Sequence, residues 1–259
     1  FAAAVQSTAA KALPAALDAL LEGEALALLT RPLIQDVTPS VQIAALGSLG
    51  TLATKDASVA TGVHSSAEVV GKLVAALSHP NTRVQYAANG SLQDVCGTSK
   101  AAATAVLEGG ILPPLRAQLE AFDDEVKEAA VRTLTVLAGH GEDVAAELLD
   151  SETLTALVVV LESKAAGATL RAAAASLVGD CASYSAALTQ RAVDAGAVAP
   201  LAALVGGARS APRLCAAALR ALGQAARHTD ALAAAVVGSG VVPAALGALL
   251  DGSPPPRAP

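Results

Sequence analysis

The chain has 259 residues, of which 53% are hydrophobic, 15% charged and only 2% aromatic, and its formal net charge is −6. This composition can bury a core, which excludes a disordered chain, and its alanine and leucine residues favour helices over a β-sandwich or barrel. The acidic balance argues against a general nucleic-acid binder. No run approaches the roughly 18–20 apolar residues of a membrane-spanning helix. We therefore expect an all-α protein that binds neither nucleic acid nor a membrane.

The chain begins with FAAAVQSTAAKALP and contains no methionine, so we expect it to be a fragment of a longer protein. Residues 1–24 predict the short helices of an incomplete first repeat. Beyond them, five leucines recur in similar sequence contexts, namely Leu49, Leu92, Leu134, Leu177 and Leu222. The intervals between them are 43, 42, 43 and 45 residues. A period in the low forties is typical of HEAT and armadillo arrays.

Each repeat has the same parts in the same order. A polar loop such as SHPNT or AFDDE supplies turn and N-cap residues, and a helix of about fourteen residues follows and carries the recurring leucine. In DDEVKEAAVRTLTVLAGHGEDVAAELL (123–149) the apolar stripe is Val126, Ala130, Leu134 and Leu137. A short second helix ends at EGG (108–110), DAG (194–196) or GSG (238–240), where glycine suits a left-handed residue. A third helix then carries Pro114, Pro200 or Pro243 in its first turn.

Three helices per repeat fit an armadillo array better than a two-helix HEAT array. We predict one right-handed superhelical solenoid over residues 1–259, with five to six repeats of about 43 residues and no second domain. The expected repeats span about 25–66, 67–109, 110–151, 152–195 and 196–239, and residues 240–259 form a partial repeat with a proline-rich exit. Small residues should let the long helices approach closely, namely Ala129, Ala130, Ala172, Ala173, Ala216 and Ala217.

Several segments resemble the armadillo repeats of the sperm-associated-antigen group, which are proteins of the ciliary central apparatus. They are LLTRPLIQDVTPSVQIAALGSL (28–49), LEAFDDEVKEAA (119–130), LAGHGEDVAAELL (137–149), AVDAGAVAPLAAL (192–204) and AARHTDALAAAVV (225–237). The chain departs from the pattern at SETL (151–154), where AGAV is expected. Alanine also replaces larger or charged residues at several positions. We therefore expect a paralogue or a divergent member of the group.

The resemblance implies a non-enzymatic structural scaffold of the motile-cilium axoneme, associated with microtubules and the cytoskeleton. Its partners would be other axonemal proteins, including armadillo paralogues and microtubule-associated subunits, and its exposed ends leave homo- or hetero-oligomers open. The alternative is a soluble cytoplasmic adaptor, such as a chaperone cofactor or a ubiquitin-pathway scaffold, because armadillo arrays serve there too.

The long helices are expected to line the concave groove of the array. Nuclear-import adaptors carry tryptophan and asparagine there, two residues before and after the leucine, but neither residue type occupies those positions here. The positions before the leucines hold Gly47, Gly90, Arg132, Ala175 and Arg220, and those after them hold Thr51, Asp94, Val136, Gly179 and Gln224. We take Asp94, Arg132, Val136, Arg220 and Gln224 as the candidate partner groove, with close access over the glycines. The alternative is that these residues form an ordinary solvated surface with no partner.

No catalytic, cofactor or metal site is predicted. The chain lacks GxSxG, P-loop and HExxH motifs and any Cys/His pair at ligand spacing. The acidic run Asp123–Glu125 is interpreted as helix capping, because carboxylates are favoured at a helix N-terminus. His140 and His228 share one repeat phase and are expected at helix C-termini. Cys96 and Cys181 also share a phase and are expected in the core.

Overall fold

The computed structural model describes residues 26, 29–33, 38–206 and 211–251, and every regular element in these ranges is helical. The predicted incomplete repeat at 1–24 and the proline-rich exit from residue 252 lie outside the described residues. After the short 3-10 helix η1 (Arg31–Leu33), three kinds of helix alternate along the chain. The prediction of an all-α protein is confirmed.

The long helices carry the recurring leucines: α3 (Pro39–Lys55), α6 (Thr82–Thr98), α9 (Asp124–Ala138), α12 (Ala168–Ala182) and α15 (Pro212–Ala225). Each is followed by a first short helix: α4 (Ala57–Ser65), α7 (Lys100–Glu108), α10 (Glu142–Leu148), α13 (Ala186–Asp194) and α16 (Asp230–Gly238). Each triplet ends with a second short helix: α5 (Ala67–Ala76), α8 (Leu112–Leu119), α11 (Ser151–Glu162), α14 (Val198–Val205) and α17 (Val241–Asp251).

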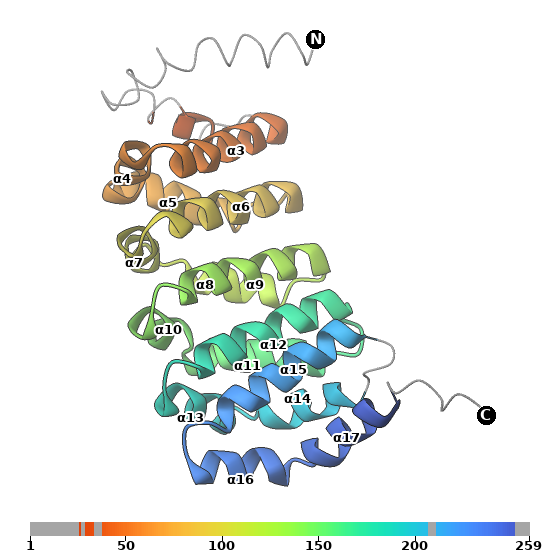
Figure 1. The fold of residues 1–259 in the computed structure, drawn as a ribbon. Helices are drawn as coiled ribbons and strands as arrows, with labels where there is room; N and C mark the ends of the chain where they lie inside the picture. Colours follow the sequence, from red (N-terminus) through yellow and green to blue (C-terminus); the bar gives the residue numbers. More distant parts are fainter. Residues whose placement is uncertain (1–25, 27–28, 34–37, 207–210, 252–259) are drawn as a thin grey trace, which may run out of the picture. The chain divides into compact units, whose positions relative to one another are not determined.

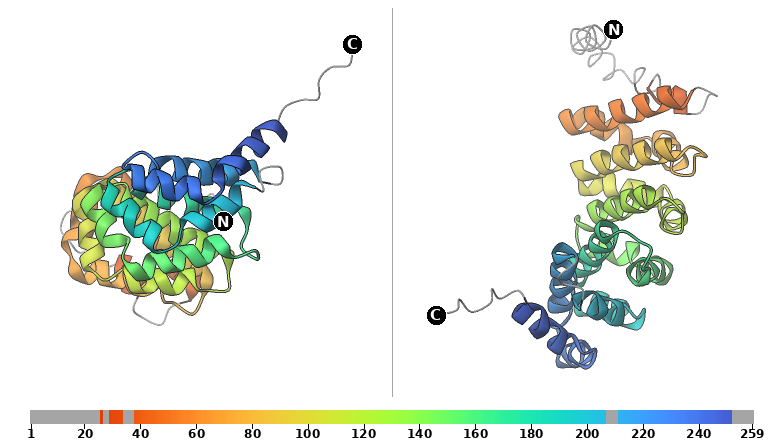
Figure 2. Two further views of the ribbon diagram at one scale, coloured as in Figure 1. Left: turned by 90° about the horizontal axis from the view of Figure 1, so that it is seen from below. Right: turned by 90° about the vertical axis from the view of Figure 1, so that its right-hand side faces the viewer.

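The chain forms two compact units, Phe1–Pro114 and Leu115–Pro259, which we call the N-terminal and C-terminal units. In the N-terminal unit, α3 lies along α6, as Figure 1 and the right-hand view of Figure 2 show. In the C-terminal unit, α12 packs against both α9 and α15, and α14 also packs against α15 (Figure 1). Stacking of long helices is therefore the main packing feature inside each unit.

Side-chain caps begin many of the helices. Where a polar residue precedes the helix, its side chain accepts a backbone N–H from the first turn and satisfies one of the otherwise unpaired donors. The residues that do so are Asp56, Ser66, Asn81, Ser99, Asp123, Asp150, Ser185 and Thr229. Asn81 and Asp123 come from the polar loops SHPNT and AFDDE, so the loop composition indicated these helix starts correctly.

Glycine separates the first and second short helices in three repeats, as predicted. Gly110, Gly196 and Gly240 have φ values of 79°, 84° and 79°, a region where a side chain would clash with the backbone. Pro114 and Pro200 are the third residues of α8 and α14, where a missing N–H leaves no hydrogen bond unmade. The first and third repeats differ, because Ser66 directly caps α5 and Asp150 directly caps α11.

The recurring leucines form the centre of the core. Leu49, Leu92, Leu134, Leu177 and Leu222 are each at most 2% exposed. The stripe predicted in the third repeat, Val126, Ala130, Leu134 and Leu137, is buried as well. Each large side chain of this kind contributes about 1.5–3 kcal/mol on burial.

The prediction that six alanines face neighbouring helices is only partly correct. Ala129, Ala130 and Ala217 are buried, but Ala172 and Ala173 are half-buried and Ala216 is exposed. The closest approach lies elsewhere, because a Cβ added to Gly179 of α12 would lie 2.8 Å from the Cα of Ala221 in α15. Because Gly179 has no side chain, α15 contacts the side of α12 that carries Gly179. The prediction had placed this contact at Ala172 and Ala173.

Replacing Leu134 by alanine should lower the free energy of unfolding by about 2–5 kcal/mol, because it leaves a cavity that the neighbouring helices cannot fill. Leu246 in the same unit is the matched control, since its side chain is 55% exposed whereas Leu134 is 1% exposed. Leu246→Ala should cost less than about 1 kcal/mol. Urea denaturation followed by circular dichroism measures both values, and equal losses would contradict the assignment of Leu134 to the core.

Candidate functional site

Asp94 is the candidate groove residue of the N-terminal unit. It lies on the exposed side of α6, and its carboxyl group reaches back toward α3. A Cβ added to Gly50 would lie 2.6 Å from Asp94 Oδ2 and 3.0 Å from the Cα of Ser91, so α3 and α6 approach closely at this glycine. Partial burial raises the pKa of Asp94 above its ordinary value. Gly47 and Gly90, by contrast, have open space where a Cβ would be.

The other four candidate residues belong to the C-terminal unit, on α9 and α15. Arg132 is exposed on α9 and pairs with Glu128, with 3.4 Å between Nη2 and Oε1. Val136 is half-buried one turn further on. Because the Arg132 pair joins residues i and i+4 at the surface, it contributes only a few tenths of a kcal/mol and can open.

On α15, Arg220 and Gln224 make different contacts. Arg220 Nη2 lies 3.3 Å from Oδ1 of Asp180 on α12, so this ion pair joins two neighbouring long helices. Gln224 is half-buried and accepts a hydrogen bond from Arg227, with 3.0 Å between Oε1 and Nη1. Arg220 and Gln224 therefore face the surface beside the line where α12 and α15 meet.

The expectation of close access over the groove glycines is wrong for Gly179 of α12. Ala175 and Gly179 occupy the same repeat positions as Arg132 and Val136, but both are buried. The physical reason is the close contact of Gly179 with Ala221, which brings α15 over this side of α12. The exposed surface of the long helices is thus interrupted at α12.

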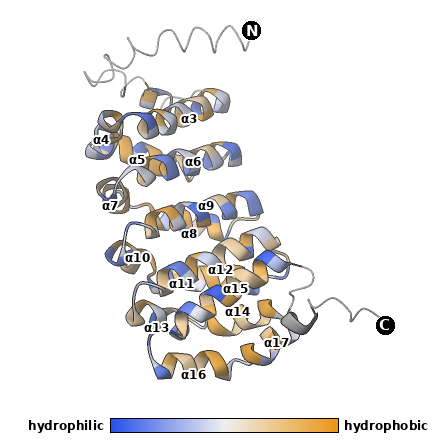
Figure 3. Cartoon of the chain, viewed as in Figure 1, coloured by the Kyte–Doolittle hydropathy of each residue, from blue (hydrophilic) through white to orange (hydrophobic). Residues whose placement is uncertain are grey.

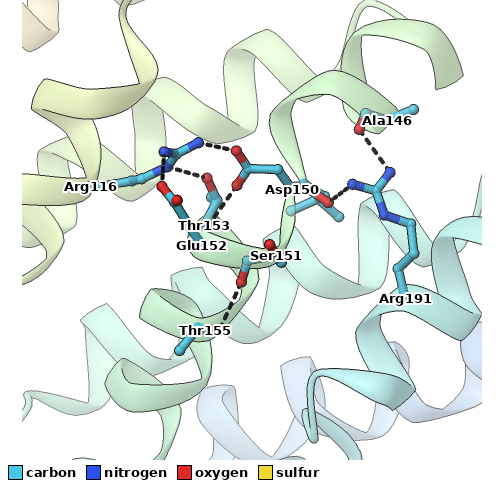
Figure 4. A network of polar contacts seen from close by, with 9 residues as sticks. Arg116, Ala146, Asp150, Ser151, Glu152, Thr153, Thr155 and Arg191 are labelled. Carbon is cyan, nitrogen blue, oxygen red and sulfur yellow. Dashed lines mark hydrogen bonds and ion pairs between the residues drawn. The ribbon is translucent and has the colours of Figure 1, made fainter.

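A polar cluster that the sequence did not reveal joins α8, α10 and α11 (Figure 4). The Asp150 carboxylate accepts the backbone N–H of Thr153 at 2.8 Å, which caps α11, and it also pairs with Arg116. Arg116 pairs with Glu152 as well, and its Nε donates to the Thr153 hydroxyl at 3.1 Å. The departure SETL therefore has a structural role, because it supplies these polar partners.

Arg191 completes the same junction from α13, as Figure 4 shows. It donates to the carbonyl oxygens of Ala146, at 2.8 Å, and Leu149. These carbonyls lie at the C-terminal end of α10, where the helix itself provides no donors. A cation at this end is also favoured by the helix dipole. The junction is thus a means of joining consecutive repeats.

Two aromatic side chains join long helices to the repeat that follows. The hydroxyl of Tyr184 donates to the carbonyl oxygen of Ala138 at the end of α9, at 2.9 Å. His228 Nε2 lies 2.7 Å from the carbonyl oxygen of Ala182 at the end of α12. The expected role of His228 at a helix C-terminus is confirmed, but the helix is that of the preceding repeat. Tyr184 was missed, although it lies 44 residues before His228 and so shares its repeat phase.

The acidic run at the start of α9 caps the helix, as predicted, and it also contacts the loop before α12. Asp123 is the N-cap and accepts the N–H of Glu125 at 2.9 Å. Asp124 accepts the N–H of Gly167, in the loop before α12, at 2.9 Å. No group of three or more histidine, cysteine or acidic side chains within the described ranges could hold a metal ion.

The cysteines are core residues, as predicted for two of them. Cys96, Cys181 and Cys215 are free thiols and buried. Burial raises the pKa of Cys96 and of Cys181 to about 12. Because the thiolate is the reactive form, burial also lowers the reactivity of both thiols.

In the part of the chain that the structure describes, no single helix is long and apolar enough to span a membrane. Two consecutive helices, Asp230–Gly238 and Val241–Gly247, are long and apolar enough only when taken together, and they meet at a bend of 61°.

The fold is similar to that of solved armadillo-repeat proteins. A designed armadillo repeat protein in complex with the peptide (KR)4 matches with a TM-score of 0.78 and 21% identity, covering 89% of this chain and 93% of its own. A second designed armadillo repeat protein matches with a TM-score of 0.75, 21% identity and coverage of 89% and 94%. An engineered protein matches with a TM-score of 0.76 and 26% identity, covering 87% and 89%.

These likenesses show that the chain has the armadillo-repeat fold. No protein-family model matches the chain, and a search of curated proteins finds no match. Membership of the sperm-associated-antigen group stays a prediction from the segments quoted above.

Replacing Gly179 by alanine should destabilise the C-terminal unit. The new Cβ would meet the backbone of Ala221, and such overpacking costs about 1–3 kcal/mol. Gly223→Ala is the matched control on α15, because open space surrounds that position and alanine favours a helix by about 1 kcal/mol. Thermal denaturation should therefore show opposite shifts, and a stabilised Gly179→Ala variant would argue against the close contact.

Replacing Asp150 by alanine should cost about 1–2 kcal/mol, because α11 loses its N-cap and Arg116 loses one carboxylate. Glu152→Ala removes the other carboxylate, whose side chain is 72% exposed, and should cost about 0–1 kcal/mol. Denaturant unfolding of both variants separates the two contributions. A larger loss for Glu152→Ala would show that the surface pair, rather than the cap, stabilises the junction.

Proposed function

We propose that the chain is a non-enzymatic scaffold of the motile-cilium axoneme, associated with its central apparatus. It would bind other axonemal proteins through the exposed positions of its long helices and through its ends. The segments that resemble the sperm-associated-antigen group support the ciliary assignment. The observation that carries the binding role is the arrangement of Arg132 and Arg220 on the outside of an armadillo-repeat fold.

Both arginines are suited to exchange partners. Their pairs with Glu128 and Asp180 lie at the surface, at 3.4 and 3.3 Å, so water screens them and little free energy is lost when they open. A guanidinium can then bind a carboxylate or a carbonyl of an incoming chain with two parallel hydrogen bonds. The designed relative in complex with (KR)4 supports peptide binding by this fold.

The partners proposed are axonemal proteins, including armadillo paralogues and microtubule-associated subunits. Tagging the protein in a ciliated cell and separating axonemes from detergent-soluble material tests the location. We expect recovery with the axoneme, and cross-linking mass spectrometry in intact cilia should then identify the neighbours. Recovery only in the soluble cell body, together with Hsp70-type chaperones or ubiquitin ligases, would favour the cytoplasmic adaptor instead.

The double variant Arg132→Glu with Arg220→Glu should weaken binding of the captured partner by about tenfold or more, because two favourable contacts become repulsive. Helicity should not change, since both side chains are exposed. Lys55→Glu with Lys164→Glu is the matched control, with the same change of charge at exposed positions at the end of α3 and before α12. Equal binding by both double variants would exclude the α9 and α15 surfaces as the contact.

A further inference from the structure

Three arginines lie at heptad spacing along the outside of α15. Arg213 and Arg220 are exposed on the helix, and Arg227 is exposed in the turn directly after it. Seven residues make almost two helical turns, so successive members rise by about 10.5 Å and point in nearly the same direction. Ala226, the C-cap, keeps right-handed helical dihedral angles, so Arg227 continues the series. We call Arg213, Arg220 and Arg227 the arginine stripe.

Small residues lie between these arginines. Ala216 and Gly223 are exposed on the same side of α15, three residues after Arg213 and Arg220. A Cβ added to Gly223 would meet nothing within 4 Å. The small residues leave the helix backbone accessible between the guanidinium groups. The backbone of another chain can therefore lie close to the helix there. In Figure 3, α15 is mostly pale and orange, with a few blue, hydrophilic segments.

The stripe is positively charged in a chain of net charge −6. Residues 212–227 contain no acidic side chain. Arg213 forms no ion pair with any described residue, and Arg227 bonds only to the neutral Gln224. Asp180 is the one acidic side chain of α12, and it pairs with Arg220. The ion pair is open to solvent, since the two side chains are 52% and 45% exposed.

The start of α15 also favours an anion. The first turn has no acidic residue, and the N-cap Ala211 has no side-chain acceptor for the free N–H groups. Arg213 therefore lies at a helix N-terminus, where its own charge is unfavourable with the helix dipole. A carboxylate from outside would relieve this repulsion and accept hydrogen bonds.

We propose that the arginine stripe binds an acidic polypeptide segment, laid along α15 with carboxylates about 10 Å apart. The inference rests on the proposed function, in which the long helices bind partners, and it adds the charge class of the partner. A guanidinium binds a carboxylate through two hydrogen bonds, and three in a row favour a chain with repeated Asp or Glu. The preference is opposite to that of the designed relative, whose peptide is the basic (KR)4.

The direct test compares two fluorescent peptides of equal length and opposite charge, (DE)4 and (KR)4, by anisotropy with the intact chain. We expect (DE)4 to bind and (KR)4 not to bind. Affinity for (DE)4 should fall between about 0.05 M and about 0.3 M salt, because the contacts are exposed. Equal or tighter binding of (KR)4 would overturn the proposal.

Two variants assign the effect to the stripe. Arg213→Gln, Arg220→Gln and Arg227→Gln together should weaken (DE)4 binding by about tenfold or more, with unchanged helicity. Asp180→Asn removes the competing carboxylate and should strengthen binding by about twofold to fivefold. Lys55→Gln with Lys164→Gln should leave binding unchanged. Unchanged binding by the triple variant, or weaker binding by Asp180→Asn, would contradict the assignment.

Further outcomes distinguish this proposal from binding of a nucleic acid and from the proposed scaffold function. Tighter binding of a single-stranded oligonucleotide than of (DE)4, lost in the triple variant, would mean that the stripe takes a nucleic acid and would overturn the polypeptide assignment. If the captured partner is lost in Arg132→Glu with Arg220→Glu while (DE)4 does not bind, the scaffold function stands and the acidic preference fails. If (DE)4 binds but the protein is absent from axonemes, the preference stands and the ciliary role fails.

Discussion

Close contact between neighbouring long helices is the constraint on which the rest of the structure depends. An armadillo helix cannot bury its apolar face alone, so the long helices within each unit lie against one another. In the C-terminal unit, Gly179 and Ala221 allow α12 and α15 to approach until their backbones nearly touch. In the N-terminal unit, Gly50 leaves room for Asp94 between α3 and α6. The small residues thus decide which sides of the helices are covered and which remain for a partner.

Polar contacts between repeats then stabilise the stacked helices. The last carbonyls of a helix have no donors within it, and side chains from the following repeat supply them. Tyr184 bonds to Ala138, and His228 contacts Ala182, each 46 residues earlier. Arg191 does the same for the end of α10. These contacts fix the offset between one repeat and the next. Apolar packing alone restricts this offset less.

Two long helices of the C-terminal unit carry arginine ion pairs that are open to solvent. Arg132 and Arg220 pair with the partly exposed carboxylates of Glu128 and Asp180, so a partner can replace those contacts at small cost. Burial, in contrast, keeps the cysteine thiols and the recurring leucines away from any ligand. The structure therefore separates an apolar interior, which holds the repeats together, from an exterior whose charges can select a partner.

The sequence by itself determined the helices, their ends and the core. Leu134 and its equivalents, the glycines at positive φ and the caps Asn81 and Asp123 all follow from local periodicity and backbone chemistry, which act within one repeat. Only the tertiary structure decided that Gly179 is covered, that SETL supplies partners for Arg116, and that Tyr184 caps an earlier helix. These outcomes depend on how one helix is rotated and offset against another, and residues more than thirty positions apart in the chain become neighbours only through that packing.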